Sequence, residues 1–125
     1  MGYFRHQAVV VVMNDFDDTQ KNAIEAFSTL QEEMGALDQE VPNPPCCIVG
    51  PVTGINGYYS WAFLPDGSKE GWNPSDTADD FRERFIEIAQ SSEHASVVEL
   101  QLGGDDGLTR ILSTTDHETI VDVEI

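Results

Sequence analysis

Basic residues are scarce in this sequence, and their scarcity excludes one class of function. Six lysines and arginines stand against 23 aspartates and glutamates, which gives a formal net charge of −17. So few bases cannot neutralise the phosphates that a nucleic-acid-binding protein must contact. We therefore expect no direct binding of nucleic acid and no attraction to an anionic membrane surface.

Cysteines are few, and long apolar runs are absent. Cys46 and Cys47 are neighbours, a spacing that suits neither a disulfide framework nor a metal site. No apolar run approaches the roughly 18 residues that a membrane span needs. The N-terminus also lacks the layout of a signal peptide. We expect a cytoplasmic protein without cofactor or metal, folded as one domain over residues 1–125.

Hydrophobic periodicity predicts two amphipathic helices between strands. The first helix is expected over 19–34, with Gly35 as its cap. The second is expected to be capped by Ser75 or Thr77 and to end before residues 91–94. Strands are expected at 8–13, 46–49, 58–64, 96–102, 108–113 and 119–125.

This order of elements predicts an α+β fold. It matches the split βαβ (ferredoxin-like) arrangement, in which an antiparallel sheet carries both helices on one face, with extra C-terminal strands. The run of valines in 8–13 predicts a strand buried on both faces. Alternation in the last strands predicts that Leu100 and Leu102 point inward.

The surplus of acids has three competing interpretations. It is a hydration coat, a binding face for a basic protein, or a cation site. The binding interpretation is carried by acids that lie off the apolar stripes of both helices. The predicted acidic face consists of Glu25, Glu32, Glu33, Asp79, Asp80, Glu83 and Glu87.

The polar loop from Asp66 to Trp72 suggests an alternative site. It precedes a helix N-terminus, where free backbone amides can receive an anion. A positive side chain and an aromatic face lie in the same loop. The alternative ligand pocket consists of Lys69, Glu70, Trp72, Asp76 and Arg82.

Catalytic motifs are missing, so no catalytic residue is assigned. The sequence has no Gly-x-Ser-x-Gly turn and no His-Glu-x-x-His helix. An enzyme that uses His6 or Asp76, such as a small hydrolase of unknown substrate, stays open as a third alternative.

The run Pro-Asp-Gly-Ser-Lys-Glu-Gly-Trp at 65–72 carries a resemblance, together with Asn56-Gly57-Tyr58 and Asp79, Arg82 and Phe85 beyond it. With the opening Gly2-Tyr3-x-Arg5-His6, and with Ser75-Asp76 and Ile86, these residues mark a stretch of about a third of the chain that resembles small uncharacterised accessory proteins of tailed bacteriophages. It departs from their pattern after Asp76. The resemblance implies a protein that acts on host machinery by binding.

The predicted function follows from the charge and this resemblance together. We expect a non-enzymatic inhibitor of a host factor with a basic surface, either anti-CRISPR-like or a nucleic-acid mimic. The alternative is a protein that binds or sequesters a nucleotide signal in the predicted ligand pocket. A homodimer is open in either case.

Overall fold

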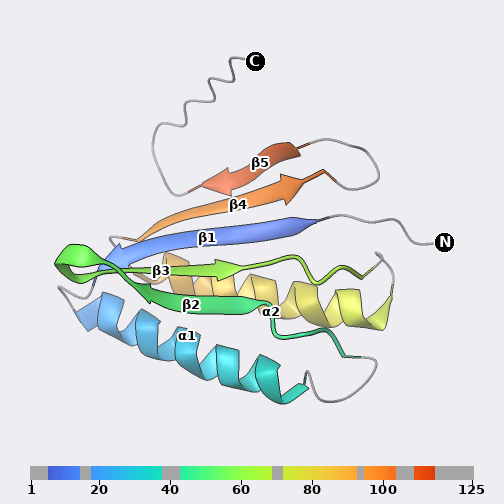
Figure 1. Ribbon diagram of the computed structural model, residues 1–125, viewed down its shortest axis with the longest axis horizontal. Helices are drawn as coiled ribbons and strands as arrows, with labels where there is room; N and C mark the ends of the chain where they lie inside the picture. The colour runs from blue at the N-terminus through green and yellow to red at the C-terminus, as the bar shows by residue number, and fades with distance from the viewer. Residues whose placement is uncertain are drawn as a thin grey trace.

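The computed structural model describes residues 6–14, 18–37, 43–68, 72–92, 95–103 and 109–114. Within them the chain forms five strands and two α-helices, arranged as a sheet with both helices against one side (Figure 1). The elements are β1 (Gln7–Asn14), α1 (Asp18–Leu37), β2 (Ile48–Thr53), β3 (Tyr58–Phe63), α2 (Asn73–Gln90), β4 (Ser96–Leu102) and β5 (Thr109–Thr114).

The sheet is antiparallel and has the strand order β2-β3-β1-β4-β5. β1 lies at the centre and pairs with β3 on one side and β4 on the other. The first four strands and two helices have the split βαβ order, and β5 extends the sheet next to β4. The predicted α+β class is therefore confirmed, with one extra strand in the described residues. The strand expected at 119–125 lies outside them.

The core lies between the sheet and the helices. Val9, Val11 and Met13 of β1 point to the helices and are at most 1% exposed. The ring of Phe27 on α1 lies 4.6 Å from that of Phe85 on α2 and 5.2 Å from that of Trp61 on β3. Aromatic pairs at such distances add to the stabilisation from burial, so both helices are fixed to the centre of the sheet.

The predicted end of the first helix and the predicted start of the second are wrong. α1 continues through Gly35 to Leu37, because Met34 and Leu37 pack on the core and outweigh the roughly 1 kcal/mol that a helical glycine costs. α2 begins at Asn73, before the expected caps. Its first turn contains Pro74, whose fixed φ suits that position, and Ser75 is buried.

β2 begins and ends later than the predicted strand at 46–49, at Ile48 and Thr53. It passes through Gly50 and Pro51, where its register with β3 shifts. Gly50 has φ +133°, a conformation that side chains disfavour, and β2 pairs only with β3 among the described strands. A bulge on an edge strand tolerates a proline, so Gly50-Pro51 bends the strand instead of ending it.

The helices cover one face of the sheet only, which corrects two predictions. Val10 and Val12 of β1 are 43% and 40% exposed, so this strand is not buried on both faces. In β4 the buried residues are Val97 and Gln101, whereas Leu102 is 42% exposed. Leu100 and Leu102 therefore lie on the side away from the helices, because the pairing of Val97 with the inward Val11 fixes the register.

We call the side of the sheet that faces away from the helices the open face. Its members follow from the strand registers and the alternation of side chains along each strand. They are Ala8, Val10, Val12 and Asn14 on β1; Val49 and Val52 on β2; Tyr58, Ser60 and Ala62 on β3, with Leu64 directly after it; Ser96, Val98, Leu100 and Leu102 on β4; and Thr109, Ile111 and Thr114 on β5.

Other local predictions are confirmed. Tyr59, Trp61 and Phe63 share the helix side of β3. Asn56 and Gly57 adopt φ of 64° and 75° in the tight connection between β2 and β3, as the Asn-Gly pair predicts. Among the described helices, none has the uninterrupted apolar length that crossing a bilayer requires.

Candidate functional site

The outer side of α2 carries a continuous row of carboxylates. Asp76, Asp80, Glu83 and Glu87 follow one another at intervals of four, three and four residues, a spacing that places them on one side of a helix. All are exposed. The buried residues of α2, such as Phe81 and Phe85, point the other way, into the core. The row therefore faces solvent along most of the helix.

A second row lies on α1. Glu25 and Glu32 are exposed and lie opposite the buried Phe27 and Leu30. Neither Glu25 nor Glu32 has an ion-pair partner within the described residues. Lys21, one turn before Glu25, is also exposed, so this row is less purely acidic than the row on α2.

Glu33 and Arg84 connect the two helices. The Arg84 guanidinium donates to the Glu33 carboxylate at 2.6 Å, and the two side chains are 43% and 48% exposed. The guanidinium also lies 5.2 Å from the centre of the Phe81 ring. This ion pair joins the flanks of α1 and α2, so the two acidic rows lie on neighbouring helices. We call the outward carboxylates of both helices the acidic helical face: Glu25, Glu32, Asp76, Asp80, Glu83 and Glu87, with Glu33 beside them paired with Arg84.

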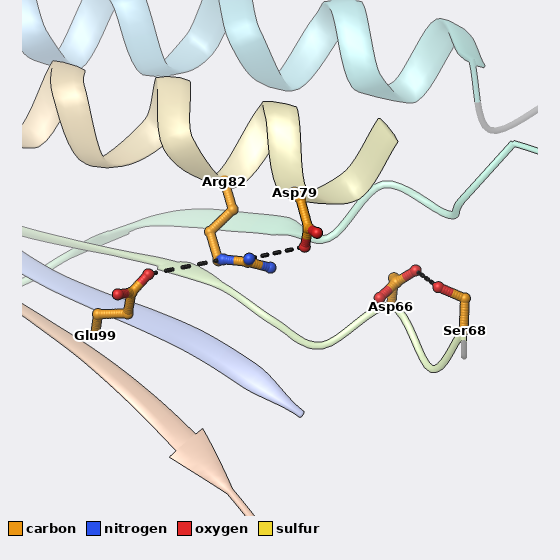
Figure 2. A network of polar contacts seen from close by, with 5 residues as sticks. All are labelled: Asp66, Ser68, Asp79, Arg82 and Glu99. Atoms are coloured by element: carbon orange, nitrogen blue, oxygen red, sulfur yellow. Dashed lines mark hydrogen bonds and ion pairs between the residues drawn. The ribbon is translucent and has the colours of Figure 1, made fainter. Parts of the chain in front are cut away.

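Asp79 has a different environment from its acidic neighbours on α2. Its carboxylate accepts a hydrogen bond from Arg82 at 2.7 Å, and the Nε of Arg82 lies 3.7 Å from a carboxylate oxygen of Glu99 on β4 (Figure 2). The side chains of Arg82 and Glu99 are only 12% and 18% exposed. This network fastens the flank of α2 to β4, so Asp79 serves that contact and adds little free charge to the outer surface.

The described acids are concentrated on the helix side of the molecule. All except Asp66 and Glu99 belong to α1 or α2, and Glu99 points to Arg82 on the helix side of the sheet. Within the described residues, the open face carries no charged side chain. Among the described residues, the acids therefore lie mainly on the helix side of the fold.

The alternative ligand pocket is only partly described. Lys69 and Glu70 lie outside the described residues. Trp72 is 51% exposed at the start of α2, whereas Arg82 is about 15 Å further along the helix axis. Because Arg82 is engaged by Asp79 and Glu99, its guanidinium points to β4 (Figure 2). A ligand pocket around Lys69 stays a prediction.

The polar start of this loop is ordered by a local contact. The Ser68 hydroxyl donates to the Asp66 carboxylate, as Figure 2 also shows. His6 lies just before β1, and its backbone carbonyl accepts a hydrogen bond of 2.6 Å from the backbone amide of Leu102. No group of three or more metal-ligating side chains occurs among the described residues. A hydrolase that uses His6 or Asp76 stays a prediction.

Sequence reasoning missed the role of the two arginines of α2. The three-residue spacing of Asp79 and Arg82 is a helical ion-pair signal and was available locally. The contacts of Arg82 with Glu99 and of Arg84 with Glu33 join elements that are distant in the sequence, so no spacing rule predicts them.

No family model, curated protein or solved structure matches this chain. The likeness to accessory proteins of tailed phages therefore stays a prediction. What the described residues present is a surface of carboxylates on two helices, with Arg82 paired with Asp79 and Glu99 and Arg84 paired with Glu33.

Proposed function

We propose that this chain is a non-enzymatic binding protein whose acidic helical face docks on the basic surface of another protein. The observation that carries the proposal is the segregation of charge: exposed carboxylates line both helices, and within the described residues the opposite side of the sheet has none. In the setting that the phage resemblance implies, the partner is a host factor and binding inhibits it.

The arrangement of the carboxylates suits a surface that normally holds a nucleic acid. Residues 76 to 87 of α2 present one carboxylate about every 5 Å along the helix axis. A DNA strand presents one phosphate about every 3.4 Å. Packed helices lie about 8–10 Å apart, so α1 adds a second, sparser row beside the first. The two acidic rows therefore present to a basic groove the same sign of charge as the phosphates of DNA, at a lower density.

Such a face acts mainly on the rate and specificity of association. Opposite potentials on the two partners steer their encounter, and this steering weakens as salt screens the charges. Each exposed charge pair contributes about 0.5–1 kcal/mol. Removal of two carboxylates should therefore weaken binding by about 5- to 30-fold.

The test uses nucleic-acid-binding proteins as defined probes. Proteins from a bacterial lysate that are retained on heparin are purified, and their affinity for the chain is measured at about 50 and 500 mM NaCl. The variant Glu83→Gln/Glu87→Gln removes two charges from the α2 row. A protein that docks on the acidic helical face should bind the chain more weakly at the higher salt concentration and bind this variant more weakly than the parent chain. Duplex DNA should displace it from the chain.

A matched control separates the face from total charge. Asp105→Asn/Asp106→Asn removes the same charge from the segment between β4 and β5 in the sequence. Its binding should remain within about twofold of the parent chain. Affinity that is indifferent to salt, or an equal loss in both double variants, would reject the acidic helical face as the binding surface.

A further inference from the structure

The open face is apolar in a chain that is otherwise rich in charge. Charged residues make up 23% of the sequence, yet none of the described residues on this face is charged. The exposed face of an antiparallel sheet is normally polar, with hydrophobic residues only on the core side. Here the central strand β1 presents two half-exposed valines, and the other four strands of the sheet add apolar side chains.

The exposed side chains of this face lie beside partly exposed ones in one apolar surface, and Ala8 at its end is buried. Val10 pairs across β1 with Ala62 of β3 and with Val98 of β4. Val49 continues the row on β2, because it pairs with Ala62. Leu64 and Ile111 add further area at 45% and 40% exposure. Contiguous apolar surfaces of several hundred Å² are uncommon on monomeric proteins and mark interaction sites.

The size of the surface suits a stable protein interface. Five strands spaced about 4.8 Å apart give a width of about 24 Å. Strands of six to eight residues at about 3.3 Å per residue give a length of about 20–26 Å. The footprint is thus about 500–600 Å² per chain, and two such faces give about 1,000–1,200 Å², the lower end of the range for specific protein interfaces.

The charge distribution identifies the occupant. A face without charge offers no counter-ion to a basic or an acidic partner, so its complement is another apolar surface. For two copies that each carry a charge of −17, close approach is least costly where no carboxylate is present. The acidic helical face lies on the opposite side of the sheet. Contact through the open faces therefore keeps the acidic surfaces of both copies apart.

We propose that two copies of this chain associate through their open faces, with the sheets stacked about a twofold axis. Stacked sheets pack about 10 Å apart with interleaved side chains, and a twofold axis places the same patch on both partners. Val10, at the centre of the patch, meets the partner sheet. The acidic helical faces then point outward on both sides of the dimer, where each remains free to bind. The pairing does not depend on what those faces bind.

The test is the oligomeric state of the full chain by sedimentation velocity from about 1 to 500 µM. The expected mass is twice the chain mass of 13.8 kDa. Val10→Lys places a charge in the middle of the contact and should raise the dissociation constant at least 100-fold. It also makes the chain less negative, so a loss of dimer cannot come from added repulsion. Val10→Thr keeps the β-branched shape without a charge and should retain most of the dimer.

Two further measurements keep the proposal falsifiable. Val52→Lys, at a site 62% exposed on the edge strand β2, should also weaken the dimer, and it serves if Val10→Lys fails to fold. Added salt should tighten the dimer, because it screens repulsion between the copies, whereas salt should weaken the binding proposed for the helices. The two proposals can therefore fail separately.

Three outcomes would overturn the pairing. A chain that stays at the single-chain mass at every concentration is one. A dimer that Val10→Lys and Val52→Lys leave intact is another, since its interface then lies elsewhere. The third is a monomer in which Val10→Cys resists thiol reagents until residues 115–125 are removed, because that segment of the same chain then covers the face.

Discussion

The contact of Arg82 with Glu99 gives the sharpest prediction about stability. At the observed separation of 3.7 Å, the gross attraction is about 4 kcal/mol for an effective dielectric constant of about 20. Desolvation of two largely buried groups offsets much of this attraction. In Arg82→Met the apolar stem is retained, but Glu99, 18% exposed, loses its counter-ion, and Asp79, 35% exposed, loses its hydrogen bond. We expect a loss of about 1.5–3 kcal/mol in the free energy of unfolding.

Arg84 on the same helix is the matched control. Its ion pair with Glu33 is shorter, at 2.6 Å, but both side chains are more than 40% exposed. Exposed pairs contribute about 0–1 kcal/mol, so Arg84→Met should cost much less than Arg82→Met. Each substitution removes one positive charge, so a general effect of net charge cancels in the comparison.

The assay is urea unfolding, supported by thermal melts. A loss of 1.5–3 kcal/mol lowers the melting temperature of a chain of this length by about 6–12 °C. The double variant Arg82→Met/Glu99→Gln should recover about 1 kcal/mol relative to the sum of the single variants. Costs for Arg82→Met and Arg84→Met that agree within about 0.3 kcal/mol would refute the argument, because burial would then have no part in the strength of these pairs.

Three further predictions concern backbone, core and charge. Gly50→Ala should lower the free energy of unfolding, measured in urea, by about 2–4 kcal/mol, because the new Cβ would lie 2.9 Å from Trp61 and the backbone has φ +133°. Gly35→Ala should instead stabilise α1 by about 0.5–1 kcal/mol, because nothing lies within 4 Å of the new Cβ. Equal effects of the two substitutions would contradict this prediction. Phe85→Ala should cost about 3–5 kcal/mol and show a lower melting temperature, because Phe85 is fully buried between two aromatic rings; a cost below 1 kcal/mol would place the core elsewhere. The melting temperature should rise between about 20 and 500 mM NaCl, because salt screens the self-repulsion of a chain with charge −17; a fall would mean that attractive pairs dominate.

The acidic helical face was largely accessible from the sequence. The periodicity of the apolar residues assigns Phe27, Leu30 and Phe85 to the core, and the exposed glutamates then follow as the opposite side of each helix. Whether an individual carboxylate is free was not accessible. Asp79 and Glu83 are equally acidic in the sequence, yet Asp79 is bound by Arg82, because the flank of α2 on which it lies turns toward β4.

The amino-acid sequence by itself determined the order of helices and strands, the side of each helix that is buried and the large excess of negative charge. These properties follow from local periodicity, turn residues and composition. Only the tertiary structure decided which face of each strand the helices cover, and hence that Val10 and Leu102 lie on an open face. The contact of Arg82 with Glu99 likewise depends on how α2 packs beside β4. Both outcomes depend on strand register and on contacts between distant segments, and alternation along one strand is compatible with either face being buried.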